Sequence, residues 1–185
     1  MLFKKIFRNI FMSPTKKLKN NKLSLKKKAS AIKLLLTDND GVLTDTGVYY
    51  SAKGEELKRF SIRDGMGVER LLALAGVETG IVTGEKSGSV LKRAEKLKIK
   101  ELYLGVKDKE AFLHKFLKLK HLKKENIAYI GDDVNDSGII KAVGFSASPV
   151  DGMKEIRDIV DYVCKNKGGN GAFREVAELI IKSKL

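Results

Sequence analysis

The chain has a single cysteine and no long apolar run. Its 185 residues include one cysteine, two prolines and no tryptophan. A lone cysteine, Cys164, excludes an intrachain disulfide and a cysteine-based metal site, and it favours a reducing compartment, so we expect a cytoplasmic protein. No apolar run approaches the roughly 18 residues of a membrane span. The length suits one domain with an extension.

Acidic residues are missing from the first 32 positions, and this absence explains most of the net charge of +14. Ten basic residues lie in this stretch, which leaves +4 for the rest of the chain. The body is therefore only mildly basic, and we expect no nucleic-acid partner.

Residues 1–30 are predicted to be a basic extension in two parts. Residues 1–12 carry apolar side chains at the spacing of an amphipathic helix, so weak membrane contact is one interpretation. A transit peptide is another, and an upstream start codon with Met12 as the natural first residue is a third. Residues 13–30 are rich in Lys, Asn and Ser, and we expect them to be disordered.

Residues 31–185 are predicted to form a single α/β domain. Short apolar segments alternate with segments of helical periodicity, which favours a parallel sheet covered by helices on both faces. Strands are predicted at 32–37, 77–82, 102–104, 127–130, 144–147 and near 162, and helices at 64–75, 87–97, 108–119, from 134, 153–158 and 172–182. Residues 47–61 are typical of a β-hairpin, and a Gly-rich tail begins near residue 166.

Polar side chains follow the predicted core strands, at the end where open α/β sheets bind ligands. Asp38 and Asp40 follow the first strand, Thr83 follows the second, Lys109 opens the helix after the third, and Asp132 follows the fourth. A carboxylate can attack phosphorus and hold it as an acyl phosphate, so Asp38 is the predicted nucleophile. Asp40 is the predicted acid/base, which protonates the leaving group and later activates water.

The same edge of the sheet is predicted to bind Mg²⁺, which prefers oxygen ligands and keeps several waters. Asp38 and Asp132 are the expected side-chain ligands, and the backbone carbonyl of Asp40 is a third. Asp133 is expected to hold a metal-bound water.

Three further residues are predicted to support phosphoryl transfer. Lys109 supplies a fixed positive charge beside the phosphoryl group, and Thr83 binds its oxygens. Asp136 is expected to orient Lys109. Taken singly, each motif has an ordinary explanation, because Asp-x-Asp-Gly is a common turn and a lysine usually lies on a solvated helix face. Their occurrence together and in order favours catalysis.

Four motifs of this chain resemble, in the same order, the four motifs of the haloacid dehalogenase phosphatases. In this chain they are residues 38–45, Thr83-Gly84, Lys109 and residues 131–136. Within that superfamily, residues 29–182 are similar to the 3-deoxy-D-manno-octulosonate 8-phosphate phosphatases. The resemblance implies a Rossmannoid three-layer α/β/α fold with a β-hairpin flap and no cap domain. It also implies Mg²⁺-dependent hydrolysis of a 3-deoxy-ulosonic sugar acid phosphate, and a homotetramer in which a neighbouring subunit helps to close each site.

Substrate-binding residues are implied by the same resemblance: Arg63, Gly84, Glu85, Lys96 and Arg174. The tail is expected to fold over the substrate, with Arg174 near its carboxylate. Glu85 stands where the octulosonate enzymes usually carry Arg, and residues 83–86 and 94–96 are more similar to phosphatases of nine-carbon ulosonate 9-phosphates. Because Arg63-Asp64-Gly65 favours the octulosonate branch, octulosonate 8-phosphate is the predicted substrate. 2-Keto-3-deoxynononate and acylneuraminate 9-phosphates are the alternatives.

Two functions of other classes compete with catalysis. A phosphatase-like scaffold without activity would not need the full catalytic set, which is present here in order. A basic protein that associates with membranes or nucleic acid would depend on residues 1–30. We expect phosphatase activity to persist when those residues are deleted.

Overall fold

The computed structural model describes residues 23–185, so the amphipathic helix and membrane contact predicted for residues 1–12 lie outside the described part of the chain. Residues 23–30 form a helix. The strands that follow are β1 (Leu34–Thr37), β2 (Thr44–Ser51), β3 (Gly54–Phe60), β4 (Glu78–Val82), β5 (Glu101–Tyr103), β6 (Ile127–Ile130), β7 (Phe145–Ser148) and β8 (Tyr162–Val163). The helices are α3 (Ile62–Ala75), α4 (Gly88–Lys96), α5 (Lys109–Lys120), α6 (Ser137–Ala142), α7 (Lys154–Arg157) and α8 (Ala172–Lys184), with 3₁₀ turns η1 (Lys124–Asn126) and η2 (Val134–Asp136).

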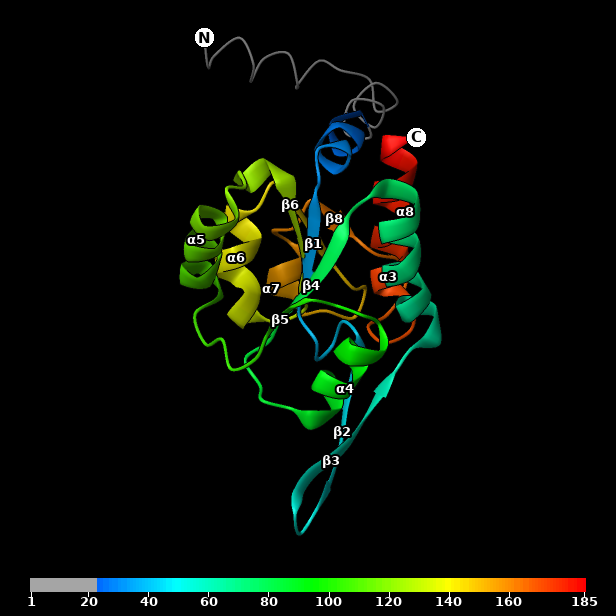
Figure 1. The fold of residues 1–185 in the computed structure, drawn as a ribbon, viewed down its shortest axis with the longest axis vertical. Coiled ribbons are helices and arrows are strands. Elements are labelled where there is room, and N and C mark those ends of the chain that lie inside the picture. The colour runs from blue at the N-terminus through cyan, green and yellow to red at the C-terminus, as the bar shows by residue number, and fades with distance from the viewer. Residues whose placement is uncertain (1–22) are drawn as a thin grey trace.

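Six strands form a parallel sheet in the order β5-β4-β1-β6-β7-β8, with β1 inside it (Figure 1). From β1 the chain passes to β4 and β5 on one side, then returns to β6, β7 and β8 on the other. Strand order therefore reverses at β1, and ligands bind at the carboxyl end of such a switch point. The predicted α/β class and parallel sheet are confirmed.

Helices cover both faces of this sheet, with α3 and α8 on one side and α5 and α6 on the other (Figure 1). The alternation of side chains along β1 shows how the two layers are built. Leu35 belongs to the core shared with α3 and α8, whereas Leu34 and Leu36 belong to the core shared with α5 and α6. Burial of apolar surface on both faces explains why the central strands β1 and β6 are almost continuously hydrophobic.

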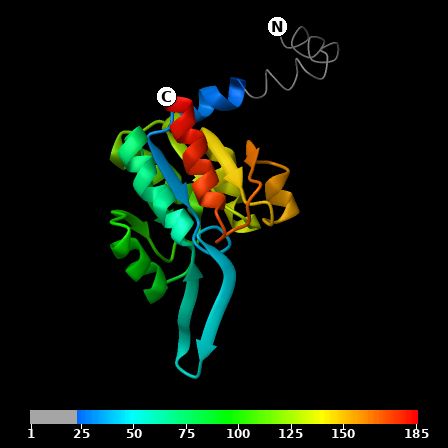
Figure 2. The same ribbon diagram turned by 90° about the vertical axis from the view of Figure 1, so that its right-hand side faces the viewer.

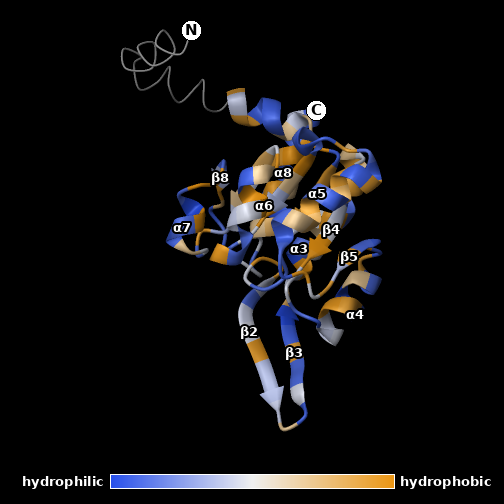
Figure 3. Cartoon of the chain, turned by 90° about the vertical axis from the view of Figure 1, so that its left-hand side faces the viewer, coloured by the Kyte–Doolittle hydropathy of each residue, from blue (hydrophilic) through white to orange (hydrophobic). Residues whose placement is uncertain are grey.

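The predicted hairpin is formed by β2 and β3, which pair in antiparallel fashion and project away from the body (Figure 2). The C-terminus lies at the opposite end of the molecule. Most of β3 is hydrophilic, in contrast to the apolar interior of the body (Figure 3). Within residues 23–185 the hairpin is the one insertion that leaves the α/β body, as expected for a domain without a cap.

The disorder predicted for residues 13–30 is wrong over residues 23–30. This stretch is helical because Leu25 and Ala29, four residues apart, share one face, and both contact the core beside α8. Lys28 of the same helix forms an ion pair with Asp161. The folded domain thus begins before residue 31. None of the helices within residues 23–185 is long and apolar enough to cross a membrane.

Candidate active site

The loop after β1 places Asp38 at the carboxyl edge of the sheet. The backbone N–H of Asp38 donates to the carbonyl of Ile130 on neighbouring β6, which continues the sheet pairing by one residue (3.0 Å). The side chain is buried, and its Oδ1 accepts a hydrogen bond from the backbone N–H of Asn39 (2.7 Å). The carbonyl of Asn39 then closes a tight turn by accepting from the N–H groups of Leu43 and Thr44. The turn fixes the carboxylate in position.

Lys109 lies at the centre of a buried hydrogen-bonded cluster. Its Nζ is 3.0 Å from Oδ2 of Asp38 and 2.7 Å from Oδ1 of Asp136, and its side chain is 1% exposed. The hydroxyl of Tyr129 donates to the same Oδ1 of Asp136 (2.6 Å) and accepts from Nζ (3.1 Å). Burial lowers the pKa of Lys109, but the charges of Asp38 and Asp136 outweigh this, so its pKa is raised. The lysine therefore stays positively charged beside Asp38.

Three carboxylates converge at this edge. Oxygen atoms of Asp38, Asp132 and Asp136 all lie within 4.8 Å of one another. The backbone N–H of Asp132 donates to Oδ2 of Asp136 (3.1 Å), which fixes the turn after β6. Among residues 23–185, Oδ1 of Asp132 is one of five buried side-chain polar atoms without a hydrogen-bond partner. Buried oxygen atoms that lack a protein donor are suited to a cation.

The protonation of these carboxylates reflects their crowding. Burial and the charge of Asp136 raise the pKa of Asp38 to about 7, although Lys109 acts in the opposite direction. Burial and the charges of Asp38 and Asp136 raise the pKa of Asp132 to about 8. One lysine thus balances only part of the negative charge. A cluster of carboxylate oxygens with surplus negative charge suits Mg²⁺, which prefers oxygen ligands.

Gly41 allows Asp132 to approach the loop after β1. A Cβ atom at this position would lie 1.9 Å from Oδ2 of Asp132, and the glycine has a φ of +80°. Both its conformation and the space around it therefore require glycine. The same carboxylate group carries the unpartnered oxygen described above.

The side chain of Asp40 is held by a residue of the hairpin, whereas that of Asp38 is held at the sheet. Both of its carboxylate oxygens accept from Nζ of Lys58 at 2.8 Å, and Oδ1 also accepts from the side-chain amide of Asn39 (3.0 Å). Lys58 lies on β3 and its side chain is 1% exposed, whereas that of Asp40 is 29% exposed. Burial lowers the pKa of Lys58, but the hydrogen bond and charge of Asp40 outweigh this and its pKa is raised.

Thr83 follows β4, which is the neighbour of β1 in the sheet. Its backbone N–H donates to the carbonyl of Tyr103, and its buried hydroxyl accepts from the N–H of Glu85 (3.2 Å). The structure therefore brings Thr83 to the same edge as Asp38, at the start of the loop 83–87. Its contact with phosphate oxygens stays a prediction.

Most of the other predicted residues lie at the surface of the isolated chain. Arg63, Lys96 and Asp133 are exposed, and Asp133 accepts from the backbone N–H of Val134 (2.6 Å). Glu85 is also exposed and lies 3.5 Å from Nζ of Lys107. Gly84 is half-buried beside it. The roles in binding substrate or water that we assigned to these residues stay predictions.

The Gly-rich tail reaches the loop after β1 through its backbone. The N–H of Gly169 donates to the carbonyl of Val42 (2.8 Å), and a Cβ on Gly168 would lie 1.9 Å from the carbonyl oxygen of Gly41. Arg174 has a different environment, because its Nε donates to Glu178 one turn along α8 (2.8 Å). The tail therefore lies beside the site, whereas the predicted contact of Arg174 with substrate would need this ion pair to rearrange.

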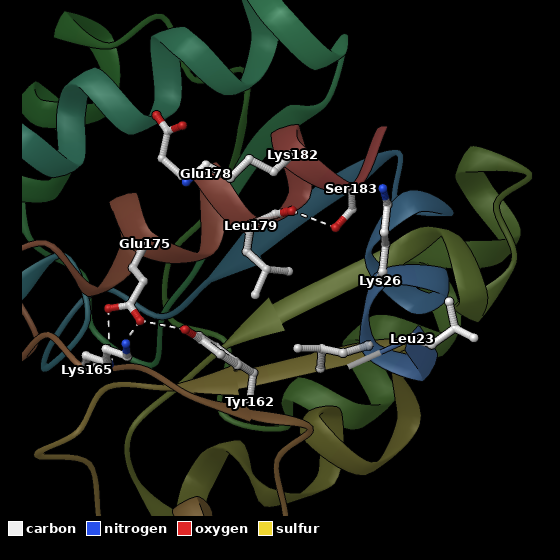
Figure 4. A pocket seen from close by; sticks show the side chains of 10 residues that line it. Leu23, Lys26, Tyr162, Lys165, Glu175, Glu178, Leu179, Lys182 and Ser183 are labelled. Atoms are coloured by element: carbon white, nitrogen blue, oxygen red, sulfur yellow. Dashed lines mark hydrogen bonds between the residues drawn. The ribbon is translucent and has the colours of Figure 1, made fainter. Parts of the chain in front are cut away.

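A cavity of about 790 Å³ lies elsewhere, between the helix of residues 23–30 and α8 (Figure 4). Leu23, Leu179 and Tyr162 contribute to its walls, and the Tyr162 hydroxyl donates to Glu175 there. None of the convergent carboxylates lines it. Chemistry and not cavity size therefore locates the candidate active site.

Two residues of the site were missed by sequence reasoning. Tyr129 occupies an apolar strand, where an aromatic residue is ordinarily core packing, and only its place two residues before Gly131 hinted at more. Lys58 stands in a strand rich in charged residues, where a lysine is ordinarily solvated, and no sequence signal distinguished it.

Comparisons with known proteins show which family the chain is similar to. A family model described as haloacid dehalogenase-like hydrolase matches residues 95–176. The 3-deoxy-D-manno-octulosonate 8-phosphate phosphatase KdsC of Yersinia pestis is 39% identical over 154 residues, which cover 83% of this chain and 82% of that protein. The Haemophilus influenzae phosphatase of the same name is 36% identical over 160 residues, covering 86% and 88%. The Moraxella catarrhalis phosphatase, crystallised with magnesium ion, phosphate ion and KDO, has a TM-score of 0.82 at 38% identity, covering 86% and 91%.

Proposed function

Because the chain belongs to the 3-deoxy-D-manno-octulosonate 8-phosphate phosphatases of the haloacid dehalogenase-like hydrolases, we propose that it hydrolyses this sugar acid phosphate in a Mg²⁺-dependent reaction. The observation that carries the proposal is the buried contact of Asp38 with Lys109 (3.0 Å) beside Asp132 and Asp136. In the proposed mechanism these residues are the nucleophile, the fixed positive charge and the cation site, and they lie together at one switch point. The Moraxella catarrhalis relative was crystallised with Mg²⁺, phosphate and the dephosphorylated sugar acid, which supports the same reaction here.

In the first step, a carboxylate oxygen of Asp38 attacks phosphorus and the bond to the sugar oxygen breaks. Asp40 donates a proton to that leaving oxygen, so the sugar acid departs as an alcohol. Lys109, held by Asp136 and Tyr129, places its positive charge beside the attacking carboxylate and the transferred group. The phosphoryl group is then an acyl phosphate on Asp38.

In the second step, water attacks phosphorus and Asp40, now a carboxylate, accepts the proton of that water. The bond between phosphorus and the Asp38 oxygen breaks, its electron pair returns to the carboxylate, and phosphate is released. Thr83 and the backbone N–H groups of its loop are proposed to bind the phosphoryl oxygens. Both steps use the same pair of aspartates.

Asp38, Asp132 and the backbone carbonyl of Asp40 are proposed to hold Mg²⁺, with Asp133 near a water bound to it. The bound ion offsets the negative charge of phosphate and carboxylates. Asp136 is placed in the same carboxylate cluster, but it accepts from Lys109, Tyr129 and the N–H of Asp132. We therefore assign Asp136 to orienting Lys109.

We propose a homotetramer assembled through the hairpins. In the single chain, Val48, Tyr49, Tyr50 and Leu57 of β2 and β3 are exposed, with Tyr50 at 73%. Apolar and aromatic side chains on a projecting hairpin are typical of a protein interface. Sedimentation velocity of the wild type should give the mass of four chains, and Tyr50→Lys should lower it. A wild-type monomer would contradict the assembly.

A cytoplasmic location is supported by the single, buried Cys164, since a reducing compartment leaves such a thiol free. Residues 1–12 are proposed to make at most weak membrane contact. Sedimentation with anionic vesicles, before and after deletion of residues 1–22, tests that contact. Equal vesicle binding by both forms would contradict it, and loss of phosphatase activity on deletion would contradict the independence of the domain.

Phosphate release from purified protein tests the function. With Mg²⁺, turnover of octulosonate 8-phosphate should exceed that of 2-keto-3-deoxynononate and acylneuraminate 9-phosphates, and a chelator should abolish it. Asp38→Asn should be inactive, whereas Asp108→Asn, at an exposed helix cap, serves as the matched carboxylate control. Preference for a nine-carbon substrate would favour the alternative that Glu85 and Lys96 suggest. Failure to hydrolyse any phosphomonoester would indicate a scaffold without activity.

A further inference from the structure

A buried ion pair links the acid/base residue to the hairpin. Nζ of Lys58 is 2.8 Å from each carboxylate oxygen of Asp40, and the two residues are 18 positions apart. A contact to both oxygens defines the rotation of the carboxyl group as well as its location. Besides this lysine, the Asp40 carboxylate has a hydrogen bond to the amide of Asn39 and a long one to the Thr44 hydroxyl (3.4 Å). Lys58 is therefore its main support.

Lys58 is itself held by a second contact. Its Nζ lies 3.3 Å from Oε2 of Glu55, and Oε1 of Glu55 accepts from the hydroxyl of Ser87. Ser87 caps α4 by accepting from the N–H of Val90, at the end of the loop that begins with Thr83. A continuous path of polar contacts thus runs from Asp40 through the hairpin to the end of the proposed phosphate-binding loop.

The location of Lys58 is unusual for a residue of a projecting strand. The other charged side chains of β3 are half-buried or exposed, whereas that of Lys58 is 1% exposed. Burying an ammonium group is unfavourable unless a carboxylate compensates for the lost hydration. A methionine or leucine would fill this space without that penalty. The charge at this position therefore points to a role that packing alone does not require.

We propose that Lys58 is a positioning residue, which aims the carboxyl group of Asp40 at the leaving oxygen and then at the attacking water. The inference rests on the proposed phosphatase activity and deepens it. The hairpin becomes part of the catalytic apparatus of its own chain. A neutral side chain at position 58 leaves Asp40 free to rotate, and proton transfer requires an oxygen within hydrogen-bond reach of the proton.

A substrate with an activated leaving group distinguishes a role of Lys58 in positioning Asp40 from a role in folding or phosphate binding. p-Nitrophenolate departs as a stable anion, so transfer of the phosphoryl group from p-nitrophenyl phosphate to Asp38 needs no proton donor. Hydrolysis of the acyl phosphate still needs Asp40 to accept a proton from water. A protein with a misplaced Asp40 should therefore release one p-nitrophenolate per active site rapidly and then turn over slowly.

The experiment compares wild type, Lys58→Met, Asp40→Asn and Lys118→Met by rapid mixing with p-nitrophenyl phosphate and Mg²⁺. Lys118 is exposed on α5, away from the hairpin, and is the matched control. We expect Lys58→Met to keep a burst of one equivalent while steady-state turnover falls about 10²-fold, in the pattern of Asp40→Asn. Lys118→Met should match wild type. For the sugar acid phosphate, kcat should fall to a similar extent with little change in KM.

Two results would overturn the proposal: unchanged turnover in Lys58→Met, or loss of the burst together with turnover, which would indicate a defect in folding or phosphate binding. Thermal unfolding of each variant is followed alongside. If Lys58→Met does not fold, Glu55→Gln decides, because it weakens the hold on Lys58 without leaving a lone buried charge. A preserved burst with slowed turnover in that variant supports the proposal, and wild-type turnover refutes it. Inactive wild-type protein would instead contradict the proposed function.

Discussion

Replacing Lys109 with methionine tests the electrostatic balance of the site. Methionine keeps most of the volume of the lysine stem, so the change removes charge and three polar contacts with little loss of packing. Those contacts are Asp38 at 3.0 Å, Asp136 at 2.7 Å and the Tyr129 hydroxyl at 3.1 Å. Without Nζ, the carboxylates of the cluster face one another with no positive charge between them.

The expected loss of stability in Lys109→Met follows from the burial of the ion pair between Lys109 and Asp136. Lys109 and Asp136 have side-chain exposures of 1% and 0%, and removal of one partner from a buried ion pair costs about 3–5 kcal/mol. We expect the free energy of unfolding of Lys109→Met to fall by about this amount without Mg²⁺. Mg²⁺ should recover part of the loss, because it binds the folded carboxylates. Turnover should fall about 10²- to 10³-fold, as when a charge-stabilising donor is removed.

Urea denaturation with and without Mg²⁺ measures the loss of stability, and phosphate release measures the loss of turnover. Lys92→Met is the control, because Lys92 lies in an exposed ion pair with Glu95 and should contribute little. A double variant, Lys109→Met with Asp136→Asn, should be less destabilised than the sum of the single variants, since it removes a stranded charge. A change in Lys109→Met no larger than that of Lys92→Met would show that the buried charge of Lys109 does not balance these carboxylates.

Three further predictions concern neighbouring groups. Tyr129→Phe removes the hydroxyl that binds Asp136 at 2.6 Å, so urea denaturation should show a loss of about 1–3 kcal/mol in the free energy of unfolding; a neutral result would contradict the buried bond. Gly41→Ala forces a methyl group against Asp132, so the Mg²⁺ concentration for half-maximal activity should rise about 10- to 100-fold, and an unchanged value would contradict the close approach. Partial burial raises the pKa of Glu175, but hydrogen bonds lower it to below its ordinary value of 4.5. Its stabilising contribution is therefore present above that value and lost as pH falls, so Glu175→Gln should lower Tm near pH 7, and this difference should shrink as pH falls progressively below 4.5; a constant difference would contradict this sign.

The convergence of the predicted site residues could be expected from the sequence because it depends on chain order alone. Asp38, Thr83, Lys109 and Asp132 each follow or open an element at a strand end, and parallel strands bring such positions to one edge. The 3.0 Å contact of Lys109 with Asp38 shows that two of these residues do meet at that edge. Element boundaries, too, differed from the structure by only a few residues, because hydrophobic periodicity was strong.

The sequence could not identify residues whose role depends on one particular side-chain contact in the folded chain. Lys58 is buried because β3 folds back over Asp40, and nothing in its own strand distinguishes it from Arg59. Tyr129 differs from a core aromatic residue only by the partner of its hydroxyl. The helix of residues 23–30 was missed because its many lysines suggested disorder. The positions of Leu25 and Ala29, which composition does not take into account, determine which face of the helix is buried.

The proposed mechanism requires Asp38 to form the covalent bond to phosphorus. To test this directly, enzyme, Mg²⁺ and sugar acid phosphate are mixed and the reaction is quenched within one turnover. The acyl phosphate is then reduced with borohydride, and the modified residue is identified by mass spectrometry. The mechanism predicts reduction at Asp38. With p-nitrophenyl phosphate as the substrate, Asp40→Asn should give a larger yield, because it forms the acyl phosphate without a proton donor and hydrolyses it slowly. Modification of a different residue, or phosphate release by Asp38→Asn at the wild-type rate, would contradict it.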